Sequence, residues 1–517
     1  MIKNKFNVLL INPYIGFKLG DFYRPLSEPL GLLYIASYLK QKSDKYNIKI
    51  LDLYALNPMQ HKRDEFDNKF YLGLTEWDKI IELIKDFSPD IIGITSQFTG
   101  YAGDPIEISK NIKEFVPSIP IIMGGAHATF FAEDILKKYK FIDFVVRGEG
   151  EITFFELIEA VRIKSEITNI TGITYRIKDN IIVSNTDRAI NDNLDEFEIP
   201  DRNLIDMSRY FCISSDIFPG SFGYPVATMV LSRGCQFNCI FCSTKNMWAN
   251  KWRGRSYASI LRELDYLIAN FKIKEIAFVD DQILGDKKWF DGLLDALIAK
   301  KITISFQIIN GLSVWLIDEN LLLKMRKTGF YKIPLPIDTG NQNTLQYINK
   351  QQISLSETKK TIELVHRLGF FSSANFLIGF PNETIAEINK TIKFAYNCGV
   401  DIVYFFIAKM HTGSDMYNTC SNMELLKDIE TSGSWANVTN SSLTISSAKL
   451  SAILYRAQKY YFIYRSFFLL NPVNFYKHVL FKLTYIKNYL LVFKFVTLRT
   501  RKIIYNRYRD IKYRLIK

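Results

Sequence analysis

Residues 232–244 read Ser-Arg-Gly-Cys-Gln-Phe-Asn-Cys-Ile-Phe-Cys-Ser-Thr, and three cysteines in this stretch, Cys235, Cys239 and Cys242, follow a Cys-x3-Cys-x2-Cys spacing. The apolar run 226–231 precedes them and predicts a strand that ends at a loop. Three thiolates on one loop fit a 4Fe-4S cluster, because the cube has four irons and three cysteine ligands leave one iron open to a substrate. The sequence therefore predicts an iron-sulfur site at a strand end.

Two other interpretations of these cysteines are weaker. Structural zinc sites close with four Cys or His ligands, usually as two pairs, and no second pair or nearby histidine follows this loop. A chance grouping is disfavoured because half of the chain's six cysteines fall within eight residues. Cys398 and Cys420 lack the spacing of a second cluster and are predicted to be buried apolar residues.

With Phe241 as the aromatic residue, the pattern Cys-x3-Cys-x-aromatic-Cys resembles the signature of the radical S-adenosylmethionine (SAM) superfamily. The resemblance implies that Cys235, Cys239 and Cys242 bind the cluster, that Phe241 lies beside the cofactors, and that SAM chelates the open iron. It also implies that an electron from an external donor, such as flavodoxin or ferredoxin, releases a 5'-deoxyadenosyl radical that takes hydrogen from an unactivated carbon. In such enzymes the protein positions and shields the cofactors.

Residues 6–163 alternate strand-like and helix-like segments. Short, branched, apolar segments at 6–12, 48–53, 90–95, 120–124 and 141–146 are separated by amphipathic stretches such as 31–42, 77–87 and 105–115. Continuous apolar strands with helical crossovers predict an α/β, doubly wound (Rossmann-like) domain. Its ligand crevice is expected at the carboxyl ends of the parallel strands.

Small and polar residues gather at these strand ends, where glycine lets the backbone approach a large flat ligand. Taken with residues 28–31, which read Glu-Pro-Leu-Gly, they resemble the cobalamin-binding domain that precedes the barrel in one large branch of radical SAM proteins. The resemblance implies cobalamin contacts from Asn12, Pro29, Gly31, Ser96, Gly124, Gly125, His127, Gly148, Glu149 and Gly150.

The older cobalamin pattern, Asp-x-His-x-x-Gly, is absent, so cobalt is expected to have no protein histidine on its lower face. His127 is the only histidine near the predicted crevice, and it lies between Gly-Gly-Ala and Ala-Thr. We expect it to be a polar wall or cap, because a histidine is usually a hydrogen-bonding residue unless other ligands converge on the same point.

Residues 164–225 are rich in turn-forming residues and predict a connector with a hairpin at 172–185. Beyond it, strand-like segments at 226–231, 275–279, 303–308, 331–337, 372–379 and 401–407 alternate with helix-like ones. These six strand-helix units and the resemblance imply the partial (β/α)6 barrel of the radical SAM fold. Functional residues of such a barrel lie at the C-terminal strand ends.

Several strand-end residues resemble SAM-binding positions of the family. Asp281, in an Asp-Asp pair, is expected to face the SAM amine, although helix capping accounts for the pair equally well. Asp338 stands in Asp-Thr-Gly where the family usually has Glu-Ser-Gly, and Gly379 and Pro381 belong to a Gly-Phe-Pro-x-Glu motif expected to accompany the adenosine. The loop 409–414 keeps only the glycine and a hydroxyl of the family's Pro-x-Pro-Gly-Thr, which predicts a divergent substrate pocket.

The net charge of +13 comes from the C-terminal tail, because residues 451–517 hold fifteen Lys or Arg against one acid, whereas residues 1–450 hold 51 bases and 52 acids. Aromatic and basic residues occur together at 460–470 and 475–495. This pattern fits an interfacial helix on an anionic membrane, a helical lid with a solvated basic face or, less well, a nucleic-acid contact.

No apolar run reaches the roughly 18 residues of a spanning helix, and thiolates kept for a cluster require a reducing compartment. We therefore expect a cytoplasmic protein, peripheral to the inner face of the membrane if the tail binds lipid. The expected domains are a cobalamin-binding domain at 1–163, a linker at 164–225, a radical SAM domain at 226–420 and a basic, aromatic-rich helical region at 421–517.

The function that the resemblance implies is methylation of an unactivated carbon, or of phosphorus, in a small-molecule or lipid-like substrate. Oxidative cyclisation or rearrangement with the same cofactors is the first alternative. A catalytically idle cobalamin sensor is disfavoured because all three cluster cysteines are present, and a tRNA methylthiotransferase because no cysteine precedes Cys212.

Overall fold

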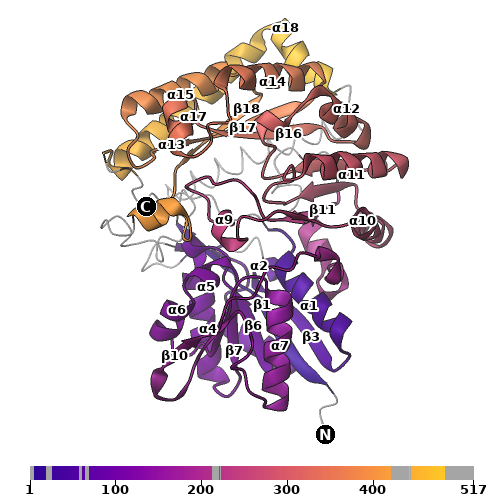
Figure 1. The fold of residues 1–517 in the computed structure, drawn as a ribbon, viewed down its shortest axis with the longest axis vertical. Helices are drawn as coiled ribbons and strands as arrows, with labels where there is room; N and C mark the ends of the chain where they lie inside the picture. Colours follow the sequence, from indigo (N-terminus) through magenta and orange to yellow (C-terminus); the bar gives the residue numbers. More distant parts are fainter. Residues whose placement is uncertain are drawn as a thin grey trace.

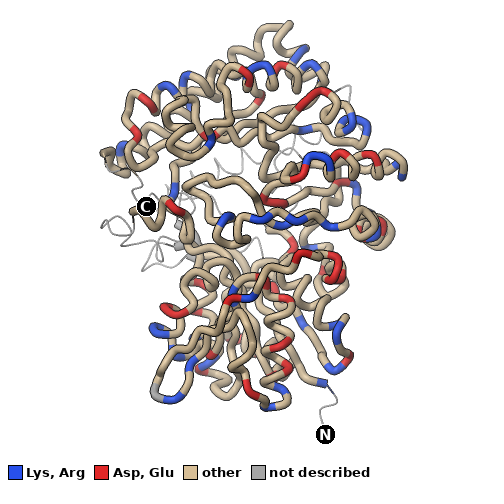
Figure 2. Tube along the Cα trace, in the orientation of Figure 1, with Lys and Arg blue, Asp and Glu red and all other residues tan. Residues whose placement is uncertain are grey.

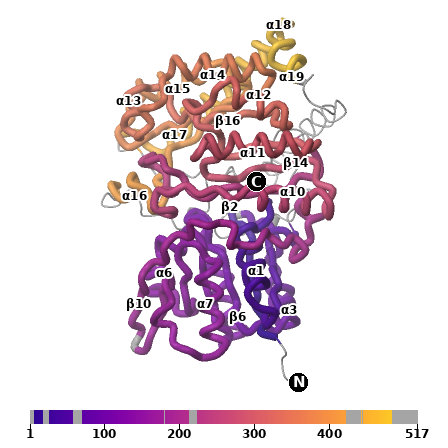
Figure 3. Tube along the Cα trace, turned by 45° about the vertical axis from the view of Figure 1, so that its right-hand side comes forward, coloured from indigo at the N-terminus to yellow at the C-terminus, as the bar shows by residue number. Residues whose placement is uncertain are grey.

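The computed structural model describes residues 5–18, 26–57, 61–63, 69–211, 221, 223–420, 442 and 444–483. Two α/β bodies are stacked along the long axis of the molecule, the N-terminal one below and the later one above (Figure 1). The turned view in Figure 3 shows the same stacking. Among the described helices, none is both long and apolar enough to cross a membrane.

The lower body is built on the predicted parallel sheet. Its parallel strands lie in the order β3-β1-β6-β7-β8, namely β3 (Tyr46–Asp52), β1 (Phe6–Asn12), β6 (Ile91–Thr95), β7 (Ile121–Gly124) and β8 (Phe144–Val146). This is the doubly wound order 2-1-3-4-5, whose ligand crevice opens where β1 and β6 diverge. The predicted fold class is confirmed.

Helices cover both faces of this sheet. The helices α1 (Leu30–Lys42) and α7 (Gly150–Ile163) share one buried apolar cluster, and α3 (Trp77–Phe87) and α4 (Gly103–Phe115) pack on the opposite face. Shorter helices, α2 (Leu53–Leu56), α5 (Ala126–Phe130) and α6 (Ala132–Lys138), follow the ends of β3, β7 and α5. The β-branched residues Ile91, Ile92 and Ile94 are buried between these layers, which is why they form a central strand.

Two features extend the lower body beyond the prediction. The hairpin expected in the connector forms β9 (Ile173–Arg176) and β10 (Ile182–Ser184) and pairs antiparallel with β8, so the first sheet continues past residue 163. A small antiparallel sheet was not predicted; it comprises β2 (Ile15–Lys18), β5 (Lys69–Leu72) and β4 (His61–Arg63).

The upper body contains the six predicted parallel strands and five of the predicted helices. The strands are β11 (Val226–Met229), β14 (Glu275–Phe278), β15 (Ser305–Ile308), β16 (Lys332–Asp338), β17 (Phe371–Ile378) and β18 (Ile402–Ile407). The helices are α10 (Tyr257–Phe271), α11 (Lys287–Ala299), α12 (Glu319–Thr328), α14 (Leu355–Arg367) and α15 (Ile385–Asn397). Each helix begins at a side chain that accepts a backbone N–H hydrogen bond, from Ser256, Asp286, Asp318, Ser354 or Thr384.

The six strands fall into two groups of three, with a break between β15 and β16. Leu312, which follows β15, donates its N–H to Pro334 O at 2.9 Å. Alternate residues of a strand face the same side, so the nitrogen atoms of Pro334 and Pro336 both face β15. Proline has no N–H to donate, and the ladder between these strands therefore stays open. Pro334 and Pro336 thus help to keep the two groups of three strands apart.

The start of the basic C-terminal region is an integral part of the upper body. The helix α17 (Ser447–Leu470) packs along β18, where Gln458 donates to Val403 O at 3.0 Å and accepts from Phe405 N at 3.1 Å. It is followed by α18 (Pro472–Phe475), a π-helical turn (Tyr476–Leu480) and α19 (Phe481–Leu483). The predicted segment at 475–495 continues beyond residue 483, outside the described residues.

Candidate active site

The cysteine loop is closed at its neck by two short strands. β12 (Ser232–Arg233) pairs antiparallel with β13 (Arg253–Gly254). Gly234 between them has a φ of 91° and leaves no room for a side chain, because a Cβ would lie 2.0 Å from Lys251 O. Asp280, at the end of β14, accepts from Ser232 N at 2.5 Å and fixes the loop to the barrel.

The three cysteines of this loop lie together and partly exposed. Burial raises the pKa of Cys235 to about 12, and the nearby Cys239 and Cys242 add to this increase. Burial likewise raises the pKa of Cys239 to about 11. Burial thus disfavours the thiolate forms of Cys235 and Cys239, which a bound metal would stabilise. Three soft ligands on one loop are the donor set that a 4Fe-4S cluster takes.

The predicted SAM-side residues surround the cysteine loop. The ring of Phe241 lies 6.0 Å from that of Phe380, which is in the Gly-Phe-Pro motif. Gly379 has a φ of 82°, and Glu383 accepts from its N–H at 2.7 Å, which holds the turn in place. Pro381 is buried in the same turn. The structure therefore brings Phe241, Gly379 and Pro381 to one place beside the cysteine loop.

A residue that the sequence reading missed joins this group. Lys350 is buried and pairs with Asp338, and its ammonium lies 6.0 Å from the ring of Phe241. Burial alone would lower the pKa of Lys350, but Asp338 and the nearby Cys239 outweigh it and raise that pKa. A buried ammonium beside the cluster ligands is a ready partner for a carboxylate. No pattern in the sequence around Lys350 marked it as part of the site.

The two aspartates after β14 have different surroundings. Asp280 is buried, accepts from Leu231 N, Ser232 N and Ser232 Oγ through one oxygen, and has no described partner for the other. Burial raises the pKa of Asp280 to about 7 in spite of these hydrogen bonds. Asp281 is accessible to solvent and accepts from Gly234 N and the Trp248 side chain. Neither aspartate is a helix cap; Asp286 caps the next helix.

The expected cobalamin crevice lies on the edge of the lower sheet that faces the barrel. At its switch point, Asn12 donates to Asp52 at 2.9 Å, and Asp52 in turn accepts from Tyr210 OH at 2.7 Å. Ser96, at the end of β6, is 1% exposed, and its hydroxyl has no described partner. Such a buried orphan hydroxyl fits a site that a polar ligand completes.

Glycines leave space around this point. Gly125 has a φ of 106°, and a Cβ there would lie 2.6 Å from Ser96 O, so only glycine allows this turn. Gly31 and Gly148 have open space where a side chain would project. Gly124 ends β7, Gly150 begins α7 and Pro29 precedes the first turn of α1. The residues present fit a large flat ligand with polar edges.

His127 is buried at the start of α5, with Nδ1 3.2 Å from Thr99 Oγ1. Its ring packs on Phe131 with 4.8 Å between centroids, and burial lowers the pKa of His127 to about 4. Thr99 Oγ1 also lies 3.1 Å from Thr412 Oγ1 of the barrel. The histidine is thus a neutral residue in a short polar chain between the two bodies.

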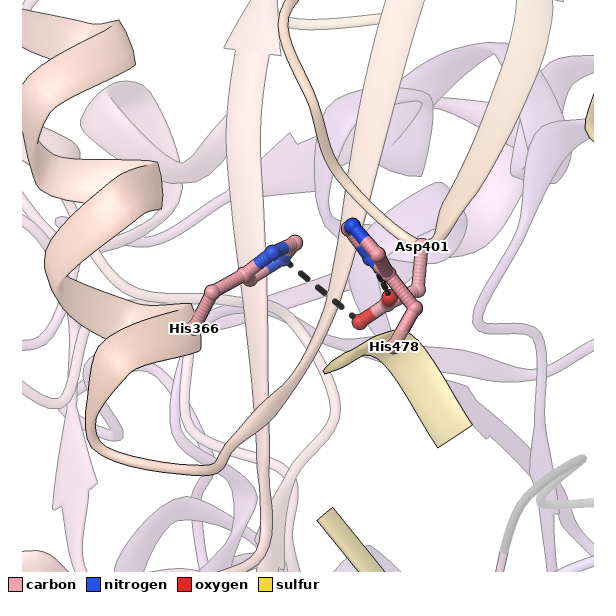
Figure 4. Close-up of side chains that lie close together, drawn as sticks. All are labelled: His366, Asp401 and His478. Atoms are coloured by element: carbon pink, nitrogen blue, oxygen red, sulfur yellow. Dashed lines mark hydrogen bonds and ion pairs between the residues drawn. The ribbon is translucent and has the colours of Figure 1, made fainter. Parts of the chain in front are cut away.

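A second group of possible metal ligands lies far along the barrel. His366, Asp401 and His478 place ligand atoms within 4.8 Å of one another (Figure 4). Asp401 also accepts from Arg465 at 3.0 Å and from buried Lys482 at 2.5 Å. Two fixed cations on the same carboxylate repel a metal ion. The group instead ties the helices after residue 447 to the first residues of β18.

Comparisons with known proteins agree with this geometry. Residues 229–395 match the Radical SAM superfamily, and residues 23–158 match the B12 binding domain. An uncharacterized methyltransferase of Pyrococcus horikoshii, PH0819, is 31% identical over 414 residues, which cover 79% of this chain and 82% of the relative. The cytidylyl-2-hydroxyethylphosphonate methyltransferase of Streptomyces wedmorensis is 29% identical over 440 residues, 80% of this chain and 81% of that protein.

Other relatives differ in reaction or share only the fold. An anaerobic magnesium-protoporphyrin IX monomethyl ester cyclase from Rubrivivax gelatinosus is 26% identical over 358 residues, 68% of this chain and 62% of the cyclase. The structure of the radical SAM methyltransferase TsrM from Kitasatospora setae, with cobalamin and a [4Fe-4S] cluster bound, superposes with a TM-score of 0.65 at 15% identity. The match covers 81% of this chain and 79% of TsrM.

The chain therefore belongs to the cobalamin-binding branch of the radical SAM superfamily. It is a radical SAM enzyme, and its cofactors are a 4Fe-4S cluster, SAM and cobalamin.

Proposed function

We propose that this enzyme methylates an unactivated carbon, or a phosphorus centre, of a small-molecule or lipid-like substrate. The observation that carries the proposal is the position of the divergent loop 409–414. Its Gly413 O accepts from Asn246 of the cysteine loop at 2.6 Å, and its Thr412 bonds to Thr99 of the cobalamin domain. A substrate held by this loop lies between the hydrogen-abstracting and the methyl-donating cofactor.

The chain's own residues have distinct tasks in this reaction. Cys235, Cys239 and Cys242 hold the cluster, and Lys350, with Asp338 as its counter-ion, receives the carboxylate of SAM. Asp281 faces the amine, while Phe241 and the Gly379 to Pro381 turn shape the adenosine side. Cobalamin, when bound, supplies the methyl group, and an external donor such as flavodoxin or ferredoxin supplies the electron.

The same loop sets the substrate class. His411 belongs to this loop, and the protein around it, together with the neighbouring Lys409, lowers its pKa to about 4. Phe130 of the cobalamin domain packs directly on Gly413. The ring of Phe130 suits an apolar part of a substrate, and the same loop also carries the cation of Lys409. The methyltransferase of Streptomyces wedmorensis is named for a cytidylyl phosphonate, which is a small but anionic molecule.

The rival function, cyclisation or rearrangement, is supported by the cyclase relative. Methyl transfer and the rival reaction can be distinguished without knowledge of the substrate. Reduced, cofactor-loaded protein given SAM with a CD3 methyl group is expected to transfer the label to bound cobalamin and to release S-adenosylhomocysteine, measured by mass spectrometry. Formation of 5'-deoxyadenosine without label on cobalamin would contradict methyl transfer and favour the rival.

Replacement of His127 by alanine is expected to leave cobalamin binding in place. Its Nδ1 is engaged with Thr99, and with its pKa lowered to about 4 it stays neutral from about pH 6 to pH 8, so cobalamin retention is also expected to be constant there. Absorption spectra of protein given hydroxocobalamin would measure this. Loss of cobalamin from His127→Ala alone would show that the histidine is a cobalt ligand.

We further propose that the segment 455–480 contacts an anionic membrane. Eleven of the twenty large apolar side chains that are exposed among the described residues lie there, and Phe467 and Leu470 are 69% and 75% exposed. Residues 444–483 contain six Lys or Arg and no acid, and four of the six, Lys449, Arg456, Lys459 and Lys477, are exposed. Aromatic side chains beside basic ones suit the headgroup region of a bilayer.

Full-length protein is expected to co-sediment with anionic vesicles, strongly at low salt and partly at high salt. Each exposed Lys or Arg contributes about 1 kcal/mol near such a surface, and only this part is screened. The double variant Phe467→Ser with Leu470→Ser should lose the salt-resistant part. The matched control, Phe115→Ser with Ile163→Ser, removes exposed apolar residues from the cobalamin domain and should change nothing; equal loss in both variants would contradict a specific surface.

A further inference from the structure

Two glutamates, Glu149 of the predicted cobalamin contacts and Glu151 two residues further on, bind residues of the barrel. Glu149 and Glu151 lie at the start of α7, directly after β8. Glu149 accepts from Arg233 Nη1 at 2.8 Å, and Glu151 from Arg233 Nη2 at 2.5 Å. Arg233 is two residues before Cys235, in the neck of the cysteine loop. The carboxylate of Glu149 is therefore already engaged by protein, which differs from the cofactor contact expected from sequence.

The other strand of the neck binds the same carboxylate. Arg253 pairs with Arg233 in the β12–β13 ladder, and its Nη1 donates to Glu149 Oε2 at 2.9 Å. The side chains of Arg233, Arg253, Glu149 and Glu151 are only 12%, 3%, 10% and 6% exposed. Buried, forked pairs of this kind have a defined geometry, because the guanidinium plane must match the carboxylate oxygens.

Further contacts make this a single fixed arrangement. The guanidinium of Arg233 lies 5.0 Å from the ring of Tyr34 and 5.1 Å from that of Phe197, so aromatic faces hold it from the lower body. Glu28, in the first cobalamin motif, accepts from Thr228 N at 3.0 Å and Thr228 Oγ1 at 2.6 Å in β11. Figure 2 shows residues of both charges along the junction of the two bodies.

We propose that Glu149 and Glu151 are positioning residues that set the distance between cobalamin and the cluster. One end of the clamp follows β8, whose neighbour Gly148 borders the crevice, and the other end is the neck of the loop that carries Cys235. The positions of both cofactors therefore depend on the same buried set of ion pairs. The proposal rests on the two cofactors of the family and is independent of the reaction that follows.

The test measures the magnetic interaction between the two cofactors in the full-length, doubly loaded protein. Reduction to cob(II)alamin and to the paramagnetic cluster broadens the cobalt EPR signal through dipolar coupling, which falls steeply with distance. Glu149→Gln and Glu151→Gln are expected to retain iron and cobalamin but to show weaker, more heterogeneous broadening than the wild type. If methyl-label transfer occurs, its rate should fall about 100-fold for a displacement of about 1 Å.

The matched control is Glu198→Gln, which removes an exposed ion pair with Arg262 and should leave the broadening unchanged. Arg233→Lys keeps the charge but loses the fork, and an intermediate broadening is expected. Unchanged broadening in both glutamine variants overturns the proposal. Should these variants fail to bind either cofactor, Arg233→Lys decides, and wild-type broadening in it overturns the proposal equally. Absence of label transfer in the wild type would contradict the proposed function alone.

Discussion

Cys239→Ala is expected to abolish the cluster and all cleavage of SAM. Cys239 is the middle ligand of a loop whose neck is closed by β12 and β13, so no other described cysteine can replace it. Anaerobically reconstituted wild-type protein should hold about four irons per chain, and the variant close to none. The measurements are iron content and 5'-deoxyadenosine after reduction.

The control for this result is Cys398→Ala. Cys398 is 4% exposed at the end of α15, where its thiol donates to Ala395 O at 3.3 Å, and its loss removes a small apolar group only. This variant should keep full iron and full SAM cleavage. About eight irons in the wild type, or an intact cluster in Cys239→Ala, would contradict a single three-cysteine site.

The predicted sites that the structure brought together share one property: each follows a strand. Cys235, Asp281 and Gly379 come after strands of the barrel, and Asp338 is the last residue of β16; the carboxyl ends of these parallel strands meet at one edge. Hydrophobic period and turn residues locate such ends without any tertiary information. The buried state of Cys398 and Cys420 was confirmed for a similar reason, because a cysteine without paired spacing behaves as a small apolar residue.

The features that were not predicted depend on contacts across the chain. Lys350 is one lysine among many in the sequence, and only the fold shows that its ammonium is buried beside Asp338 and Cys239. Glu149 looked like a crevice residue, but its partners Arg233 and Arg253 are about a hundred positions away. Neither pairing leaves a local pattern, since ion pairs between separate elements of the fold have no sequence period.

The C-terminal region contains both a feature that the sequence predicted and one that it did not. Its aromatic and basic composition was plain, but composition did not show that Tyr461 is buried and donates to Val400 O while Phe467 is exposed. A truncation before α17 would uncover β18, because Gln458 satisfies backbone groups of that strand. Substitutions on the exposed face therefore test the membrane proposal better than removal of the tail.

Glu263→Gln is expected to destabilise the barrel more than any other single change of one charge described here. Glu263 is fully buried in α10 and accepts from Arg202 of the connector and from Arg255, both at 2.5 Å. Burial alone would raise the pKa of Glu263, but the two guanidinium groups outweigh it and lower that pKa. The variant leaves two buried cations without a carboxylate, which costs about 3–5 kcal/mol.

For a barrel of this size, such a loss lowers the midpoint of thermal unfolding by about 10 °C, measurable by circular dichroism. Because the folded-state pKa of Glu263 is lowered, its contribution is present above the unfolded-state pKa of about 4.3 and disappears as the pH falls below it. The difference in midpoint between wild type and variant should therefore be full at pH 7 and shrink in acid.

Glu198→Gln, which affects an exposed pair with Arg262 on the same helix, is the control and should shift the midpoint little, since exposed pairs contribute about 1 kcal/mol or less. Equal shifts in the two variants would show that the buried triad contributes no more than a surface ion pair.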